Sequence, residues 1–154
     1  MKVLIVYDTV SPMKLTAKVA ETISGVLKEK GIEVDSFFVK DVDKAIVKNY
    51  DCLVAGSPTM YFRASSGIMQ FLDGLPRKEF SGKLAAAFDT QYESRISGSA
   101  VKGVEGKLKG LGFKLVTAPL VAYVEGKMNE PRLKEGELEK AKSWAQTVAE
   151  ALSK

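Results

Sequence analysis

The sequence predicts an α/β protein built on a doubly wound, five-stranded parallel sheet. Two patterns alternate along the whole 154-residue chain: short apolar runs of strand length and longer amphipathic stretches of helical length. This alternation is typical of repeated strand–helix–strand units, whose connections are right-handed in about 98% of cases. The first run, Val3–Tyr7, is almost wholly aliphatic, as expected for a central parallel strand that helices cover on both faces.

The first predicted helix spans about residues 16–30. Its apolar residues recur at helical spacing and leave lysines and glutamates on the opposite face. Gly31 follows as the C′ residue that ends the helix. The apolar face comprises Val19, Ile23, Val26 and Leu27.

The remaining elements continue the alternation. They are a strand over 33–39, a short helical turn capped by Asp41 with 45–47 turned inward, a strand over 51–56, a helix over 66–75 stopped by Pro76, a small-residue strand over 83–88, a helix over 99–111 closed by Gly112, a strand over 114–124 and a helix over 135–152. Pro119 lies within the last strand, which indicates an edge position or a bulge.

The composition excludes several kinds of chemistry. Cys52 is the only cysteine, so neither an intramolecular disulfide nor a cysteine-based zinc site is expected. The chain has no histidine, which removes the usual general base and the commonest metal ligand. Hydrolase chemistry of the Ser-His or Cys-His kind is therefore excluded, and no metal site is expected.

Length, hydrophobicity and charge predict the number of domains, the location and the kind of partner. One domain spanning 1–154 is expected, because the length is ordinary for one core and no linker composition interrupts it. No stretch approaches the roughly 20 apolar residues that cross a bilayer, so we expect no membrane association and a cytoplasmic location. The net charge of +4 is spread along the helices without a basic stripe between aromatics, so no nucleic-acid partner is expected.

The first of three notable loops, residues 8–16, reads DTVSPMKLT and leads directly into the first long helix. Unsatisfied N–H groups at a helix N-terminus bind a phosphate, and the hydroxyls of Thr9, Ser11 and Thr16 offer further donors. The simpler interpretation is that Thr16 or Ser11 is an N-cap and Pro12 a turn residue.

The second loop, residues 57–65, reads SPTMYFRAS and places Met60, Tyr61 and Phe62 where a polar connection is expected. A flat heteroaromatic ring stacks well on Tyr61 or Phe62, which adds about 1 kcal/mol beyond the burial of area. Alternatively, Phe62 folds back on the core and Met60 fills a gap.

The third loop, residues 89–97, reads DTQYESRIS and offers Tyr92 among polar groups. The sequence SGSA at 97–100 resembles a helix cap, so an extended loop precedes the helix, a setting that often carries function. Glu93 and Arg95 are interpreted as a solvated pair.

Three motifs stand in a particular order and spacing: Tyr7-Asp8-Thr9, Gly56-Ser57-Pro58-Thr59, and Phe88-Asp89-Thr90 followed by Leu111-Gly112-Phe113. Together they resemble the flavodoxins and, more closely, the flavodoxin domains of flavodiiron-type proteins. The resemblance covers nearly the whole chain and implies a flavodoxin-like fold.

The resemblance also implies FMN, with its phosphate in the first loop and its isoalloxazine ring between the second and third loops. A protein of this family transfers electrons between redox partner proteins, here as a monomer or small homo-oligomer, without a catalytic side chain. The implied FMN contacts are Asp8, Thr9, Val10, Ser11, Lys14, Leu15, Thr16, Ser57, Pro58, Thr59, Met60, Tyr61, Phe62, Asp89, Thr90, Gln91, Tyr92 and Ser97.

The chain departs from the family pattern in its phosphate loop and in its charge, and its second loop lacks the glycine that many flavodoxins have there. The usual phosphate loop reads Thr/Ser-x-Thr-Gly-x-Thr, whereas this loop is longer and has Pro12, Met13 and Lys14 in place of the glycine. Lys14 either supplies compensating charge or is simply solvated. Most flavodoxins are acidic and dock on basic partners, so a net charge of +4 implies either acids gathered near the flavin or a different partner.

Other functions remain open at this stage. An FMN-dependent NAD(P)H:quinone oxidoreductase shares the family, although its larger insertions do not fit so compact a chain. A flavin-free flavodoxin-fold interaction module is the second alternative, because the phosphate loop is atypical. A phosphoacceptor signalling domain needs an acid pair after the first strand and an aspartate after the third, where this chain has only Asp8 and Gly56-Ser57.

Overall fold

The computed structural model describes residues 1–9, 13–60, 63–93 and 100–154. Within them the helices are α1 (Leu15–Glu29), α2 (Ser66–Asp73), α3 (Ala100–Gly110) and α4 (Glu137–Leu152), with 3-10 helices η1 (Val39–Asp41) and η2 (Lys44–Asn49). The strands are β1 (Lys2–Tyr7), β2 (Glu33–Phe38), β3 (Cys52–Met60), β4 (Arg63–Ala64), β5 (Leu84–Tyr92), β6 (Lys114–Leu115), β7 (Leu120–Lys127) and β8 (Glu130–Leu133).

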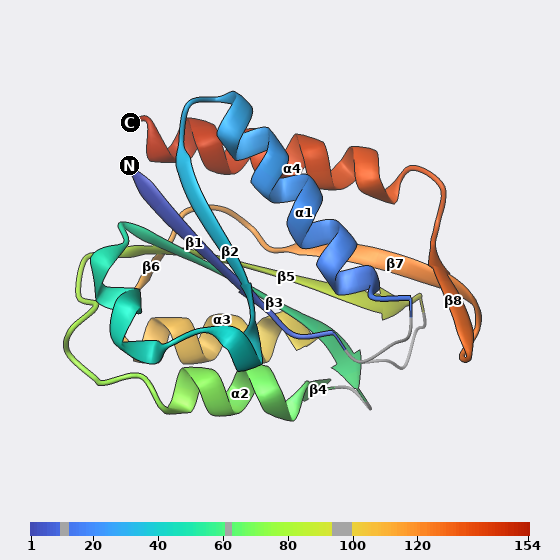
Figure 1. The fold of residues 1–154 in the computed structure, drawn as a ribbon, viewed down its shortest axis with the longest axis horizontal. Helices are drawn as coiled ribbons and strands as arrows, with labels where there is room; N and C mark the ends of the chain where they lie inside the picture. The colour runs from blue at the N-terminus through green and yellow to red at the C-terminus, as the bar shows by residue number, and fades with distance from the viewer. Residues whose placement is uncertain (10–12, 61–62, 94–99) are drawn as a thin grey trace.

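The sheet has helices on both faces (Figure 1). Its strand order is β2-β1-β3-β5-β7-β8, and the first five of these strands are parallel. The order reverses at β1, because the chain passes first to β2 on one side and then to β3 on the other. The predicted doubly wound, five-stranded parallel sheet is confirmed as the centre of the fold.

The core lies in two layers because successive side chains of a strand point to opposite faces. Val3 and Ile5 of β1 pack with α1 and α4, whereas Leu4 and Val6 pack with α2 and α3. All four side chains have no exposed surface, which explains the unbroken apolar run of this strand. The alanines 85–87 of β5 are also fully buried between the two helix layers.

The last parallel strand differs from the prediction. It is broken into β6 and β7, and Pro119 lies in the break rather than inside a strand. The indole N–H of Trp144 on α4 donates to the carbonyl of Ala118 at 2.8 Å, which satisfies the backbone where the ladder is interrupted. β7 is not an edge strand, since it pairs with β5 on one side and antiparallel with β8 on the other.

The short helical turn and the ends of β3 and β5 also differ from the sequence prediction. The short helical turn is capped by Asp43, whose carboxylate accepts from the Ala45 N–H at 2.9 Å, and not by Asp41. Of the three residues expected inward, Val47 is buried and Ala45 is exposed. β3 and β5 continue to Met60 and Tyr92, so residues 57–59 and 89–92 belong to strands and not to loops.

The chain termini and the carboxyl ends of the central strands lie at opposite ends of the sheet. Both chain termini lie at one end, whereas β1, β3 and β5 finish at the other, beside the starts of α1, α2 and α3 (Figure 1). Among the described helices, none is long and apolar enough to span a bilayer.

Candidate functional site

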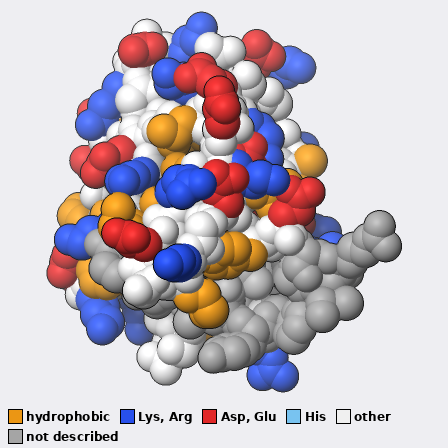
Figure 2. Space-filling view, turned by 90° about the vertical axis from the view of Figure 1, so that its right-hand side faces the viewer, with side chains coloured by type: hydrophobic (Ala, Val, Ile, Leu, Met, Phe, Trp, Pro, Cys, Tyr) orange, Lys and Arg blue, Asp and Glu red, His pale blue; other side chains and the backbone are white. Residues whose placement is uncertain are grey.

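The candidate site is the end of the sheet where β1, β3 and β5 finish, called here the mouth. Ligands of open α/β sheets bind beyond the carboxyl ends of the strands where the strand order reverses, which here is between β1 and β3. Figure 2 views this end of the molecule. In its described part, basic and acidic side chains are intermingled and hydrophobic side chains reach the surface between them.

Asp8 joins the first loop to both ends of the second. This carboxylate follows β1 and is only 6% exposed. It accepts from the Thr9 N–H at 2.9 Å and from the Ser65 hydroxyl at 2.6 Å. Ser65 is the N-cap of α2 and also donates its own N–H to the Ser57 hydroxyl at 2.9 Å. The two ends of the second loop are thereby held together against the end of β1.

Gly67 makes this arrangement possible. A Cβ atom at Gly67 would lie 2.5 Å from Oδ2 of Asp8, closer than any real Cβ contact. The absent side chain lets the Asp8 carboxylate approach the first turn of α2. There the partial positive charge of the helix N-terminus favours an anionic group.

Asp89 makes the corresponding connection between the second and third loops. Its side chain has no exposed surface. Its Oδ2 accepts from the Thr59 hydroxyl at 3.1 Å, from the Gln91 amide at 2.9 Å and from the Val101 N–H at 3.4 Å. Thr59 in turn accepts from the Ala100 N–H at 3.1 Å. Residues on both sides of the third loop are thus bound to the end of β3.

Thr16 and Thr90 close the ring of contacts. Their hydroxyls lie 2.9 Å apart and both side chains are buried. This bond joins the start of α1, where the first loop ends, to the end of β5, where the third loop begins. The bases of all three loops are therefore tied together by side-chain hydrogen bonds.

The described residues at the start of α1 leave its first N–H groups without a side-chain cap from the N-cap residue. Lys14 occupies the N-cap position in the left-handed conformation, with φ of 51°, and makes no side-chain capping bond. No acidic residue stands in the first turn. The interpretation of Thr16 as an N-cap is wrong, because Thr16 lies inside the helix and bonds to Thr90. The side chain of Leu15 is buried in the protein.

Tyr92 is the half-exposed aromatic of the described mouth. Its side chain is 37% exposed, and its hydroxyl donates to the Lys127 carbonyl on β7 at 3.3 Å. This bond holds the ring beside the hairpin formed by β7 and β8.

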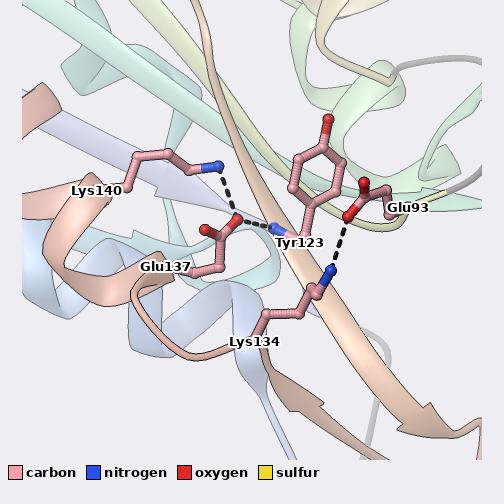
Figure 3. Close-up of polar contacts among 5 residues, drawn as sticks. All are labelled: Glu93, Tyr123, Lys134, Glu137 and Lys140. Atoms are coloured by element: carbon pink, nitrogen blue, oxygen red, sulfur yellow. Dashed lines mark hydrogen bonds and ion pairs between the residues drawn. The ribbon is translucent and has the colours of Figure 1, made fainter.

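Glu93, next to Tyr92, has a partner that the sequence did not indicate. Lys134 donates to its carboxylate at 2.8 Å, which joins Glu93 to the segment before α4 (Figure 3). The pairing of Glu93 with Arg95 stays a prediction, because Arg95 lies outside the described residues. The hydrogen bond from Lys134 and its positive charge lower the pKa of Glu93, and Glu93 likewise raises the pKa of Lys134.

The segment bearing Lys134 is itself fixed to the sheet. Glu137 accepts from the Tyr123 N–H at 2.7 Å and pairs with Lys140 at 2.7 Å (Figure 3). The Lys140 ammonium lies 4.7 Å from the centre of the Tyr123 ring, within the range of a cation–π contact. Through Lys134, Glu93 is therefore joined to β7 and to the start of α4.

Several predicted site residues lie outside the described part of the chain. They are Val10, Ser11, Tyr61, Phe62 and Ser97, and of Met60 only the backbone is described. The structure brings together Asp8, Thr9, Lys14, Leu15, Thr16, Ser57, Pro58, Thr59, Asp89, Thr90, Gln91 and Tyr92 at the mouth. Sequence reasoning missed Ser65, although a serine directly before an apolar helical stretch is a common N-cap signal.

These features define a class: a doubly wound α/β protein in which polar side chains join the ends of β1, β3 and β5 beside a helix whose N-cap residue makes no side-chain cap. The sequence model of the family described as flavodoxin matches residues 6–144. The chain belongs to the flavodoxin family.

Individual relatives agree with this membership. A flavodoxin of Clostridium saccharobutylicum is 33% identical over 91 residues, which are 58% of this chain and 56% of that protein. Oxidised flavodoxin 2 from Bacillus cereus superposes with a TM-score of 0.81 and 25% identity over 97% of this chain and 99% of that chain. A flavodiiron core from Synechocystis shares the fold, with a TM-score of 0.74 and 17% identity over 99% of this chain and 36% of that chain.

Proposed function

We propose that this protein binds FMN at the mouth and carries electrons between redox partner proteins. Membership of the flavodoxin family supports a flavodoxin-like electron-transfer function. The observation that carries the proposal is the ring of hydrogen bonds among Asp8, Ser65, Thr59, Asp89 and the Thr16–Thr90 pair, which ties the bases of three loops around one end of the sheet. Such preorganisation suits a site that holds a rigid ligand.

The residues at the mouth fit the two ends of FMN. The first N–H groups of α1 would hold the phosphate, because the helix N-terminus has no side-chain cap and no acid in its first turn. Lys14 adds positive charge at the same point. The isoalloxazine ring would lie between the second and third loops, with Tyr92 available for stacking.

FMN, when bound, supplies the redox chemistry by accepting and releasing electrons. The protein's residues would hold the ring at the mouth and exclude water from it. No side chain of the mouth needs to act as an acid or base for this function.

Titration of flavin-free protein with FMN and with riboflavin tests the proposal. We expect the visible absorbance bands of FMN to shift and its fluorescence to be quenched at a 1:1 ratio, with weaker binding of riboflavin because it lacks the phosphate. An unchanged spectrum and no heat of binding would instead favour the flavin-free interaction module. Rapid bleaching of bound flavin by NADPH alone, followed by quinone turnover, would favour the oxidoreductase.

A further inference from the structure

Asp89 stands out among the residues of the mouth because its carboxyl group is fully buried and several donors converge on one of its oxygens. The donors come from different parts of the chain. Thr59 is 30 residues before Asp89, and Val101 is 12 residues after it. A buried carboxyl group that collects donors from distant segments fixes the positions of those segments.

The segments joined in this way are the flanks of two loops. Thr59 lies in the last part of β3, just before the second loop. Ala100 and Val101 open α3, just after the third loop. The Ala100 N–H donates to Thr59 on β3 and the Val101 N–H donates to Asp89 on β5, so two adjacent bonds hold the start of α3 to the ends of both strands. The distance between the second and third loops at their bases is therefore set by these contacts.

We propose that Asp89 is a positioning residue that sets the width of the slot for the flavin ring without contacting the flavin. This inference rests on the proposed function. The side chain of Asp89 is covered by the protein, and its Oδ2 is occupied by donors from Thr59, Gln91 and Val101. Its influence on a ligand therefore passes through Thr59 and through the start of α3.

The proposal predicts an effect on the ring and not on the phosphate. FMN and riboflavin share the isoalloxazine ring, whereas only FMN carries the phosphate. A residue that sets the ring slot affects both ligands by the same factor. A residue that holds the phosphate affects FMN and spares riboflavin.

The experiment compares the binding of FMN and riboflavin to wild type, Asp89→Asn and Thr59→Val. Asp89→Asn removes the negative charge and turns one of the two buried oxygens into an NH₂ donor, which weakens the bonds from the converging donors, so we expect both ligands to bind about 10-fold more weakly. Thr59→Val keeps the shape of the side chain and removes its hydroxyl, and we expect a loss of about 3-fold to 10-fold for both ligands. If Asp89→Asn does not fold, Thr59→Val carries the same comparison.

Asp35→Asn is the matched control. Asp35 also accepts a side-chain hydrogen bond, from the Tyr50 hydroxyl, but it lies in the middle of β2 away from the mouth. We expect this variant to lose stability while its affinities for both flavins stay within about twofold of wild type. Equal weakening of binding in Asp35→Asn and Asp89→Asn would overturn the proposal. Loss of FMN binding with riboflavin binding retained would also overturn it, as would unchanged affinities in both mouth variants.

Amide hydrogen exchange in the flavin-free protein tests the anchoring directly. We expect Asp89→Asn and Thr59→Val to speed exchange at the amides of Ala100 and Val101 about 10-fold, with α4 unaffected. Unchanged exchange at these amides would overturn the anchoring role. If wild type binds neither flavin, the proposed function fails, and the exchange result still decides whether Asp89 holds the start of α3.

Discussion

The hydroxyls of Thr16 and Thr90 lie 2.9 Å apart, although the two residues are separated by 74 positions in the sequence. Thr16 stands in the first turn of α1 and Thr90 near the end of β5. Both side chains are buried, so a bond between their hydroxyls replaces hydrogen bonds to water. The bond fixes the start of α1 to the last part of β5.

Thr16→Val is expected to lower the free energy of unfolding by about 1–2 kcal/mol. The substitution removes the hydroxyl at nearly constant volume and leaves the Thr90 hydroxyl buried without this partner. Urea denaturation of the flavin-free protein, followed by circular dichroism, measures the loss.

The double variant T16V/T90V is the control for this bond. Its loss of stability should be smaller than the sum of the two single losses, because removing both hydroxyls leaves no unpaired group. Strictly additive losses would show that the two hydroxyls do not interact in solution.

Gly56→Ala is expected to destabilise the protein by about 3 kcal/mol. A Cβ atom at this position would lie 2.1 Å from the Cζ atom of Phe88. The Phe88 ring cannot move away, because it is fully buried and packs edge-on against Trp144 at 6.4 Å between ring centres. Thermal unfolding measures the effect, and the second change Phe88→Leu should recover part of it.

Gly25→Ala is the matched control for this substitution. Gly25 is exposed in the middle of α1, and an added Cβ would have no atom within 4 Å. Alanine has the higher helix propensity, so this variant should gain about 0.5–1 kcal/mol. Equal destabilisation by the two substitutions would contradict the steric explanation for Gly56.

Tyr50 makes the stability sensitive to alkaline pH. Burial, together with the hydrogen bond and charge of Asp35, raises the pKa of Tyr50 from 10.0 to about 12. Because the folded pKa lies above the unfolded value, the stabilisation is complete below pH 10 and is lost as the pH rises towards 12. The full loss amounts to at most about 2–3 kcal/mol.

Tyr50→Phe should therefore flatten the dependence of stability on pH in this range. Urea titrations at several pH values should show a shallower fall for the variant than for wild type, and a lower stability at neutral pH because the 2.6 Å bond to Asp35 is gone. Some slope should remain, since burial also raises the pKa of Tyr7. Parallel curves for the two proteins would refute the assignment.

The Cys52 thiol should be inert in the native protein. Burial raises its pKa to about 12, with a smaller contribution from the charge of Asp51, and only 1% of the residue is exposed. The thiolate is the reactive form, so a disulfide reagent such as DTNB should label the protein only after unfolding. Rapid labelling under native conditions would show that β3 opens locally.

The internal connections of the candidate site were not predictable from the sequence. The segments after the first, third and fourth predicted strands were expected to form the site, and the corresponding strands β1, β3 and β5 do finish at the same end of the sheet. That the residues there bind a flavin stays a prediction. Their roles could not be read from the sequence, because a serine or threonine that holds a ligand and one that holds another loop have the same local sequence. The pairing of Glu93 with Lys134 had no local signal either, since 41 residues separate them.

The sequence by itself determined the alternation of strands and helices and the faces that each element buries. Apolar spacing near 2 or 3.6 residues is a local property of the sequence. Burying the resulting apolar face stabilises the strand or helix wherever that element lies in the fold. Only the tertiary structure decided where the strands end and which polar groups pair. Residues 57 and 58 extend β3 because β5 pairs with them, and residues 59 and 60 extend it further because β4 pairs with them. Pro119 breaks the last parallel strand where Trp144 donates to the carbonyl of Ala118. Such contacts depend on distances between segments far apart in the chain, which no local pattern encodes.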